Sequence, residues 1–398
     1  MARTIPIFVD TKSSPSAPLE FRVSPPLALY VHVPWCVQKC PYCDFNSHEA
    51  GETIPEREYV DALIADLQSA LPLIWGRPVV SVFFGGGTPS LLSPEAIDEL
   101  LAAFRALAML APDAEITLEA NPGTVEAGKF AGFRAAGVNR LSLGIQSFND
   151  EHLKSLGRIH GAEEAKRAAR LAGQYFETFN LDLMYGLPGQ THEQALTDVE
   201  TALSFSPTHL SCYQLTLEPN TRFAAFPPEL PEGDICADMQ EAIEARLARA
   251  GFSNYETSAF ALANRQCKHN LNYWYFGDYL GIGAGAHSKL TLHDRVLRQM
   301  RHKHPKAYLE SMRSGNAVQE HNEVEASSLP FEFMMNALRL ADGFHPSLFE
   351  ARTARSLNSI MPQLKAAEAE GLLEVGPERI APTAKGRRFL NVLLERFL

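Results

Sequence analysis

The sequence predicts an α/β fold in which parallel strands alternate with helices, followed by a small helical module. Three helical segments, Tyr59–Leu71, Glu95–Leu107 and His192–Leu203, lie between β-rich apolar runs. There are six such runs: Leu27–Val33, Val79–Phe84, Ile116–Glu119, Arg140–Gly144, Phe179–Met184 and His209–Leu215. Strands that alternate with helices form βαβ units and therefore a parallel sheet. Periodicity alone leaves open whether this sheet is open and doubly wound or forms a partial barrel.

The pattern divides the chain into four predicted regions. Residues 1–26 contain a Ser- and Pro-rich stretch and indicate an extended arm. The βα units and a further helix at Ala237–Ala250 occupy residues 27–250. Residues 251–325 form an extension that is rich in aromatic residues and glycine, and a polar linker at 314–328 spans its boundary with the next region. Residues 326–398 form the C-terminal module.

The C-terminal module resembles a winged helix in its order of elements. Helices are predicted at Leu329–Leu340 and Pro362–Glu370, and an amphipathic helix closes the chain. Between them, residues 371–382 predict two short strands joined at Gly376 and Pro377. Winged helices often bind DNA, but a fold does not determine a function.

Composition and charge narrow the class of protein. The chain has 398 residues, of which 45% are hydrophobic and 21% charged, as is typical of a folded protein. Its net charge of −11 disfavours a nucleic-acid partner, and a zinc-stabilised nucleic-acid-binding protein is the least favoured hypothesis. No apolar run approaches the ~20 residues of a membrane span, and the N-terminus lacks a secretory signal. We therefore expect a cytoplasmic protein; peripheral membrane association and the oligomeric state stay open.

The strongest chemical signal is a cluster of cysteines directly after the first predicted strand. Cys36, Cys40 and Cys43 fall within eight residues, and thiolates are ligands for iron–sulfur clusters or zinc. Loops at the carboxyl ends of parallel strands are also where α/β folds place their active sites. Two alternatives remain at this point: a zinc site completed by His32 or His48, and a redox pair formed by Cys40 and Cys43. Cys212, Cys236 and Cys267 are isolated in the sequence and are expected to be buried small hydrophobic residues.

The CxxxCxxC spacing after the first strand resembles the radical S-adenosylmethionine superfamily. The resemblance implies a partial (β/α)6 barrel over roughly residues 27–220. It also implies that Cys36, Cys40 and Cys43 ligate a [4Fe–4S] cluster whose fourth iron is chelated by S-adenosylmethionine.

Several polar residues and a glycine run follow the other predicted strands. Consecutive glycines let a backbone approach a ligand closely, although a structural turn explains the run equally well. Each polar residue taken singly is explained by a solvated strand end. As a group they match the cofactor contacts of the branch that includes the oxygen-independent coproporphyrinogen III oxidases. The resemblance implies S-adenosylmethionine contacts at Tyr30, Tyr42, Gly86, Gly87, Thr88, Glu119, Gln146, Arg158 and Asp182.

A second signature lies in the predicted extension, where the sequence HNLNYW precedes a glycine-rich run. Histidine is a common haem ligand and apolar rings pack against the macrocycle. A buried aromatic cluster with a hydrogen-bonded histidine is the simpler explanation from the residues alone. However, HNxxYW resembles the signature of the radical-SAM haem chaperones. It implies haem binding by His269, Asn270, Tyr273 and Trp274.

The resemblance predicts a haem chaperone that transfers haem to apo-haemoproteins such as respiratory enzymes. The competing hypothesis is an oxygen-independent coproporphyrinogen III oxidase, which removes two carboxyl groups by radical chemistry. The oxidases carry a further cysteine two positions after the third cluster ligand, where this chain has Phe45. The short arm before the first strand also leaves little of the N-terminal region that oxidases use with their substrate. Whether the cluster performs chemistry or regulates haem transfer is not evident from the sequence.

Overall fold

The computed structural model describes residues 18–51, 53–124 and 127–398. Most of the predicted arm, residues 1–17, lies outside the described residues. Residues 18–26 lead into the first strand, and the Phe21 amide donates a hydrogen bond to the His293 carbonyl at 2.8 Å.

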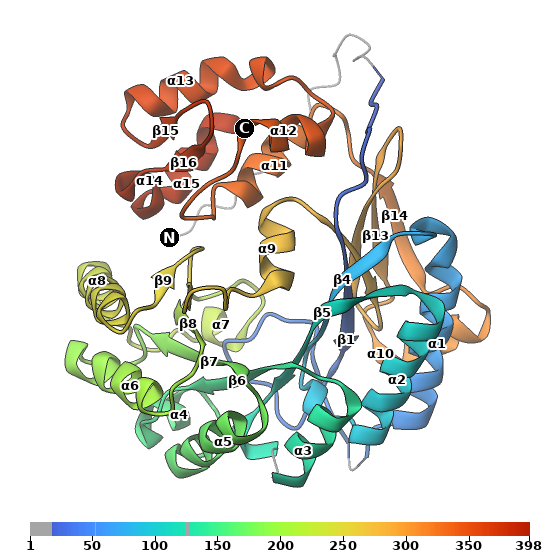
Figure 1. Ribbon diagram of the computed structural model, residues 1–398. Helices are drawn as coiled ribbons and strands as arrows, with labels where there is room; N and C mark the ends of the chain where they lie inside the picture. The colour runs from blue at the N-terminus through green and yellow to red at the C-terminus, as the bar shows by residue number, and fades with distance from the viewer. Residues whose placement is uncertain (1–17, 52, 125–126) are drawn as a thin grey trace.

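A parallel sheet of six strands forms the centre of the molecule (Figure 1). Its strands lie side by side in chain order and all pair in parallel. They are β1 (Leu27–Val33), β4 (Pro78–Gly86), β5 (Met109–Ala120), β6 (Arg140–Gln146), β7 (Thr178–Tyr185) and β8 (His209–Gln214). Each contains one of the six predicted apolar runs almost entirely. β1 is buried along almost its whole length, as expected for a parallel strand covered on both faces.

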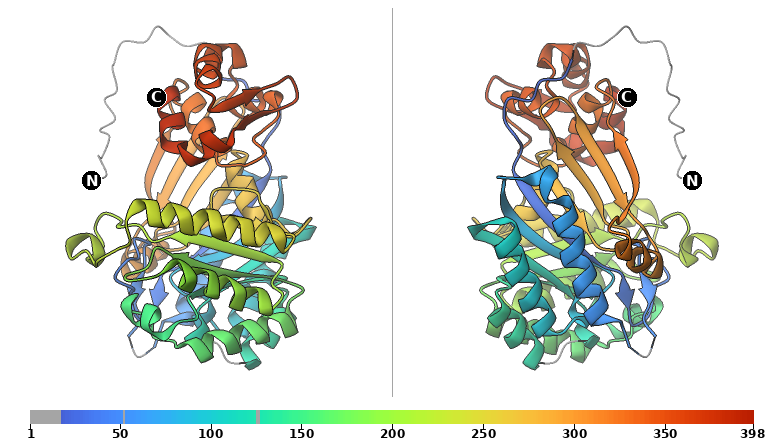
Figure 2. Two further views of the ribbon diagram at one scale, coloured as in Figure 1. Left: turned by 90° about the vertical axis from the view of Figure 1, so that its left-hand side faces the viewer. Right: turned by 90° about the vertical axis from the view of Figure 1, so that its right-hand side faces the viewer.

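Helices in the connections cover the outer face of this sheet (Figures 1 and 2). They are α1 (Glu56–Ile74), α2 (Pro94–Leu107), α3 (Ala127–Ala136), α4 (Asp150–Ser155), α5 (Ala162–Tyr175), α6 (His192–Ser204) and α8 (Gly233–Arg249). The short helix α7 (Arg222–Ala225) lies instead beside the cysteine loop, where the Phe223 amide donates to the Pro41 carbonyl at 2.9 Å. Local sequence explains their starts; at α2, for example, the Ser93 hydroxyl accepts the Ala96 amide and Pro94 occupies the first turn. The α/β fold with a parallel-dominated, unclosed sheet is the one the sequence predicted.

The residues of the predicted extension continue the same sheet on both sides. β10 (Ala259–Ala261) and β9 (Ser253–Asn254) follow β8, and β11 (Asp278–Ile282) pairs in parallel with β1. β12 (His287–Thr291), β13 (Val296–Arg301) and β14 (Val318–Glu323) then add antiparallel strands, with α10 (Pro305–Arg313) before the last of them. The helix α9 (Lys268–Trp274) carries the HNLNYW segment.

The predicted linker at 314–328 is wrong in part, because it contains β14. This strand forms the edge of the sheet and five of its six residues are exposed. An exposed edge strand is covered with polar and charged side chains, so its composition resembles that of a loop.

The C-terminal module has its own core, which Phe333, Phe344, Phe349 and Leu364 share. It consists of α11 (Leu329–Ala337), α12 (Pro346–Thr353), α13 (Met361–Ala369), the hairpin β15 (Leu373–Val375) and β16 (Ile380–Pro382), α14 (Ala384–Arg388) and α15 (Leu390–Leu394). The predicted hairpin is confirmed, whereas the single closing helix is divided at Phe389. Figure 1 shows the module stacked on one end of the sheet, with α9 between them. Among the described residues, no helix is both long and apolar enough to span a bilayer.

Candidate functional site

The cysteine loop leaves β1 at its carboxyl end and is closed at its base by a short pair of strands. β2 (Trp35–Cys36) pairs with β3 (His48–Glu49), and the Ala50 amide donates to the Cys36 carbonyl at 2.7 Å. The Lys39 ammonium donates to the carbonyls of Phe45 and Ser47 inside the loop, at 3.3 and 3.1 Å. These bonds give the cysteine segment a defined path.

Asn46 ties the cysteine loop to the neighbouring sheet. Its side-chain amide donates to the carbonyls of Ala284 and Lys303, at 3.0 and 2.9 Å, and its own carbonyl lies 2.8 Å from His32 Nε2. The loop between β11 and β12 lies against Asn46 so closely that a Cβ on Gly285 would stand 2.1 Å from Asn46 Nδ2. The glycine-rich run after HNLNYW therefore supports the cysteine loop.

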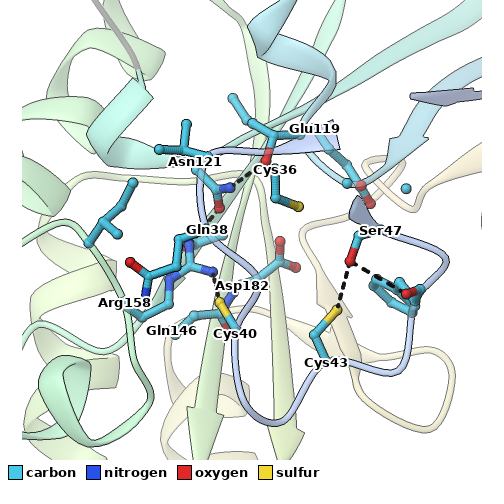
Figure 3. A pocket seen from close by; sticks show the side chains of 18 of the residues that line it. Cys36, Gln38, Cys40, Cys43, Ser47, Glu119, Asn121, Gln146, Arg158 and Asp182 are labelled. Atoms are coloured by element: carbon cyan, nitrogen blue, oxygen red, sulfur yellow. Dashed lines mark hydrogen bonds between the residues drawn. The ribbon is translucent and has the colours of Figure 1, made fainter. Parts of the chain in front are cut away.

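Most of the predicted cofactor residues line one pocket together with the three cysteines (Figure 3). The pocket lies at the carboxyl ends of the parallel strands, the edge at which α/β folds bind ligands. The lining includes Cys36, Cys40, Cys43, Tyr42, Gly86, Gly87, Thr88, Glu119, Gln146, Arg158 and Asp182. Residues from β4, β5, β6 and β7 and from two connections thus meet around the thiols.

Arg158 joins the cysteine loop to the far side of the pocket. Its Nη1 lies 3.6 Å from Cys40 Sγ and 3.5 Å from the Tyr42 hydroxyl, and its Nη2 donates to Asn121 Oδ1 at 2.5 Å. Asn121 in turn donates to the Thr88 hydroxyl at 2.9 Å. The sequence reasoning missed Asn121, although its place two residues after Glu119, at the end of the same strand, was an available signal.

The glycine run is required where β4 passes beneath the cysteine loop. Gly86 has a φ of 111°, and a Cβ there would stand 2.5 Å from the His32 ring. A Cβ on Gly87 would stand 2.5 Å from the Trp35 carbonyl oxygen. The structural explanation of the run is therefore confirmed. Gly86 and Gly87 also line the pocket, and their contact with a ligand stays a prediction.

Two carboxyl groups lie in the pocket, and the pKa of each is raised. Burial, together with the charge of Asp182, raises the pKa of Glu119 to about 8. Burial also raises the pKa of Asp182, which accepts hydrogen bonds from Asn180 and Ser142 at 2.8 and 3.2 Å. Carboxyl groups held in this way are poised to bond hydroxyl or amino groups of a ligand.

Gln146 adds backbone strain to the same pocket. Its φ of 68° is unusual for a residue other than glycine, and the pairing of β6 with β7 shifts register just before it. Strain of this kind persists where surrounding structure holds it and is concentrated at functional sites.

The thiols of the cysteine loop suit a cluster better than a single ion. All three are free and partly exposed, and burial raises the pKa of Cys36 and of Cys43. Within the described ranges, no three His, Cys, Asp or Glu side chains converge as ligands of one ion would. In a [4Fe–4S] cluster each thiolate binds a different iron, so the sulfurs need not converge. His32 is unsuited to complete a zinc site because its two ring nitrogens contact the Tyr30 hydroxyl and the Asn46 carbonyl.

Tyr30 lies below this pocket instead of lining it. Its hydroxyl is 3.0 Å from His32 Nδ1, and its ring borders Gly85 together with Glu119 and Phe83. On the other side, the Tyr30 ring lies 6.4 Å from the His269 ring. Tyr30 thus stands between the cysteine pocket and the α9 helix.

His269 points inward from α9 toward β4 and is sealed from solvent. Its side chain is 3% exposed, its ring stacks on Phe83 at 4.9 Å, and its Nδ1 lies 2.9 Å from the Ser81 hydroxyl. Burial and the charge of Arg140 lower the pKa of His269 to about 3, so the ring is neutral. Its Nε2 is buried and, among the described residues, has no hydrogen-bond partner.

Of the other three residues of the signature, only Tyr273 lies on the same face of α9 as His269. It stacks on Tyr279 at 4.3 Å. Asn270 and Trp274 lie on a different face, and the Arg339 guanidinium lies 5.2 Å from the Trp274 ring. The N-terminus of α9 is held by Glu115, whose carboxylate accepts the amides of Lys268 and His269 at 3.1 Å each. The segment is therefore a packed aromatic cluster around a hydrogen-bonded histidine, the simpler explanation considered from the sequence, and it does not adjoin the cysteine pocket.

The three remaining cysteines, Cys212, Cys236 and Cys267, are buried and free, as expected. Cys267 differs from the other two, because its thiol lies 3.4 Å from the Glu115 carboxylate that holds α9.

Two protein-family models match this chain, one over most of the parallel sheet and one over the C-terminal module. Residues 30–202 match the Radical SAM superfamily, and residues 326–389 match the HemN C-terminal domain. A solved structure titled as coproporphyrinogen III oxidase (HemN) from Escherichia coli, a radical SAM enzyme, superposes with a TM-score of 0.79 and 26% identity. That superposition covers 94% of this chain and 90% of the oxidase chain.

Relatives with greater identity carry a different name. A protein of Escherichia coli named "Heme chaperone HemW" is 51% identical over 94% of this chain and 98% of its own length. A protein of the same name from Haemophilus influenzae is 50% identical with the same coverage. A mouse protein named "Radical S-adenosyl methionine domain-containing protein 1, mitochondrial" is 41% identical over 71% of this chain.

Proposed function

This chain belongs to the heme chaperone HemW family within the Radical SAM superfamily, and from that premise we propose that it holds haem at the α9 helix and a cluster in the separate cysteine pocket. The observation that carries the proposal is His269, a neutral histidine whose Nε2 is buried without a partner in the described part of the chain. Neutral imidazole is the form that ligates haem iron.

In this proposal Cys36, Cys40 and Cys43 hold a [4Fe–4S] cluster, and the pocket around them holds S-adenosylmethionine. When bound, a reduced cluster supplies one electron and an open iron site to S-adenosylmethionine. Glu119 and Asp182 bond the hydroxyl or amino groups of the ligand, while Arg158 stabilises the thiolate of Cys40 and orients Asn121. Gly86, Gly87 and Thr88 form the wall next to Cys36.

Haem binding at His269 requires a movement of α9. Ser81 contacts one ring nitrogen of His269, and Phe83 covers one ring face. A macrocycle therefore reaches Nε2 only after the helix separates from β4. The hydrogen bonds that the Glu115 carboxylate accepts from two backbone amides at the start of α9 oppose this separation. We infer a chaperone that opens to accept and release haem.

The remaining parts of the proposal concern partners and location. We propose apo-haemoproteins, such as respiratory enzymes, as recipients. A cytoplasmic location agrees with six free cysteines, because an oxygen-sensitive cluster and unpaired thiols need a reducing compartment.

The experiment is a haem titration of purified protein, with His269→Ala compared with His321→Ala. His321 is an exposed histidine on β14, so its loss controls for non-specific surface binding. We expect the Soret band of the bound haem and its affinity to change in His269→Ala only. An identical spectrum and affinity in both variants would remove His269 as the ligand.

The alternative activity, porphyrinogen decarboxylation, is tested with the same preparation. Phe45, at the position where the oxidases carry a cysteine, is 61% exposed and lines the cysteine pocket. We expect no anaerobic turnover of coproporphyrinogen III by the reconstituted protein. Turnover would show that the protein is an enzyme and not only a chaperone.

A further inference from the structure

A second cavity lies on a different face of α9 from the one that carries His269. It has a volume of about 790 Å³, within the ~300–1,000 Å³ of typical cofactor pockets. It is lined by Lys268, Leu271 and Asn272 of α9 and by Tyr275, the residue after the helix, which follow the i, i+3, i+4, i+7 spacing of one helix face. The opposite wall belongs to the C-terminal module and includes Phe344 and Leu348. The cavity thus lies between the signature helix and the module.

The charges behind this cavity are unbalanced in favour of cations. The buried carboxylate of Asp278 is shared by Arg77 at 2.8 Å and Lys289 at 3.0 Å. Arg352, on α12, is the third cation whose charge acts on Asp278. Three cations therefore face one carboxylate, and Arg77 Nη1 has no hydrogen-bond partner within the described ranges.

Arg352 is the cation of this group that reaches the cavity. Its side chain is half-buried, its Nε donates to the Tyr275 carbonyl at 3.3 Å, and it forms no ion pair within the described ranges. Burial lowers its pKa, as expected for a charge without a paired anion. The other cations of the lining are already matched, because Lys268 pairs with Asp113 and Arg379 with Glu374. A carboxylate bound at Arg352 would balance the excess charge.

The two carboxylates of the lining, Asp342 and Glu378, lie 3.9 Å from the Arg379 guanidinium and 3.5 Å from His345 Nε2, and neither pairs with Arg352. The remaining lining includes an apolar surface. Pro26, Val80, Leu271, Phe344 and Leu348 supply apolar surface. Both ring nitrogens of His345 have contacts: Nδ1 accepts the Ser347 amide at 3.2 Å as the cap of α12, and Nε2 lies 3.5 Å from the Glu378 carboxylate. The lining therefore combines apolar surface with one cation, Arg352, that has no paired anion in the described part of the chain.

We propose that this cavity is a second porphyrin site, in which a propionate binds Arg352 and the macrocycle lies between α9 and the C-terminal module. The proposal rests on the proposed haem-chaperone function and adds to it a site that does not ligate iron. Haem bound there lies next to the helix that must move to expose His269. The site therefore holds haem without a bond to its iron, before His269 binds the iron or after His269 releases it.

The test uses iron-free protoporphyrin IX, whose binding to the full chain is followed by fluorescence. Arg352→Gln is expected to weaken binding about tenfold or more, the effect of losing one charge-assisted contact in a partly buried site. Protoporphyrin IX dimethyl ester, which lacks the acid groups, should bind weakly and equally to both proteins. Lys365→Gln removes a cation from the exposed side of α13, outside the cavity, and should leave binding unchanged.

A second variant keeps the test valid if Arg352→Gln does not fold. Ser347→Trp fills the cavity from an exposed position on α12 and should block protoporphyrin IX. His269→Ala should leave protoporphyrin binding unchanged while it alters the haem spectrum.

The outcomes separate this inference from the proposed function. Haem binding that depends on His269, together with porphyrin binding insensitive to both cavity variants, overturns the second site and leaves the chaperone. Failure of the unmodified chain to bind haem overturns the chaperone function itself.

Discussion

The cysteine pocket and the α9 helix carry the two predicted ligand sites, and they differ in how open they are. The cysteine pocket is lined by half-buried polar side chains from β5, β6 and β7, and its thiols are partly exposed. His269 is 3% exposed and packs against Phe83 and Ser81. In the proposed function, the first site therefore admits its ligand directly, whereas the second must open first.

This difference follows from where each segment lies relative to the sheet. The carboxyl ends of parallel strands diverge into loops, which leave space between polar side chains. α9 instead packs against β4, β1 and β11, where apolar and aromatic side chains close the interior. In the proposed function, the movement that opens the closed site to haem also allows haem to leave again.

The largest expected effect breaks the open site alone. Cys40→Ser removes one of the three proposed cluster ligands and should abolish cluster assembly, because a cluster held by two thiolates is not retained. Iron and sulfide analysis after anaerobic reconstitution measures the loss. Cys236→Ser, at a buried cysteine outside the pocket, should retain full iron content. Haem binding at His269 should survive in Cys40→Ser, and its loss would contradict the separation of the two sites.

The next effect tests the support that the β11–β12 loop gives to the cysteine loop. Gly285→Ala should lower the free energy of unfolding by about 2–4 kcal/mol, because it combines a φ of 80° with a clash against Asn46. Gly315→Ala is a matched control with the same φ of 80° and no neighbour within 4 Å, so it should cost about 1 kcal/mol. Denaturant unfolding and iron content are the measurements. Equal losses of stability in the two variants would mean that the Asn46 contact contributes nothing.

The third effect is a dependence of the free energy of unfolding on pH, which arises from Glu119 in the open site. Glu119 has a pKa of about 8 in the folded chain and an ordinary value of 4.5 when unfolded. Between these values the folded chain holds a proton that the unfolded chain has lost, so stability falls as the pH rises, by at most ~1.4 kcal/mol per unit. Glu119→Gln should flatten this slope in unfolding experiments on the cofactor-free chain at pH 5–8. Parallel slopes for the two proteins would refute the raised pKa.

The smallest effect concerns the opening of the closed site. Glu115→Gln weakens the hold on the first amides of α9 by about 1 kcal/mol, which should raise the rate of haem association about fivefold. Stopped-flow mixing with haem measures the rate. Glu163→Gln removes an exposed carboxylate that pairs with Lys166 on α5, and it should leave the rate unchanged. A slower rate in Glu115→Gln would show that haem needs α9 in place.

Local patterns predicted the strands and the cysteine pocket because their signals are short-range. Each apolar run maps onto one strand, and residues at successive strand ends meet at the same edge of a parallel sheet. Asn121 was overlooked because one asparagine after a strand resembles loop sequence, although its place two residues after Glu119 was a signal for it. β14 was missed because an exposed edge strand has the composition of a linker.

The sequence by itself determined the fold class, the cysteine motif and the HNLNYW signature, since each depends on residues close together along the chain. The tertiary structure alone decided that the signature histidine faces inward, because only packing against β4 chooses which side of a short helix is covered. It also brought Gly285 onto Asn46, 239 positions away (285 − 46), and Arg352 to the cavity beside α9. These contacts depend on how the sheet continues beyond β1 and where the C-terminal module packs, and no local pattern encodes either.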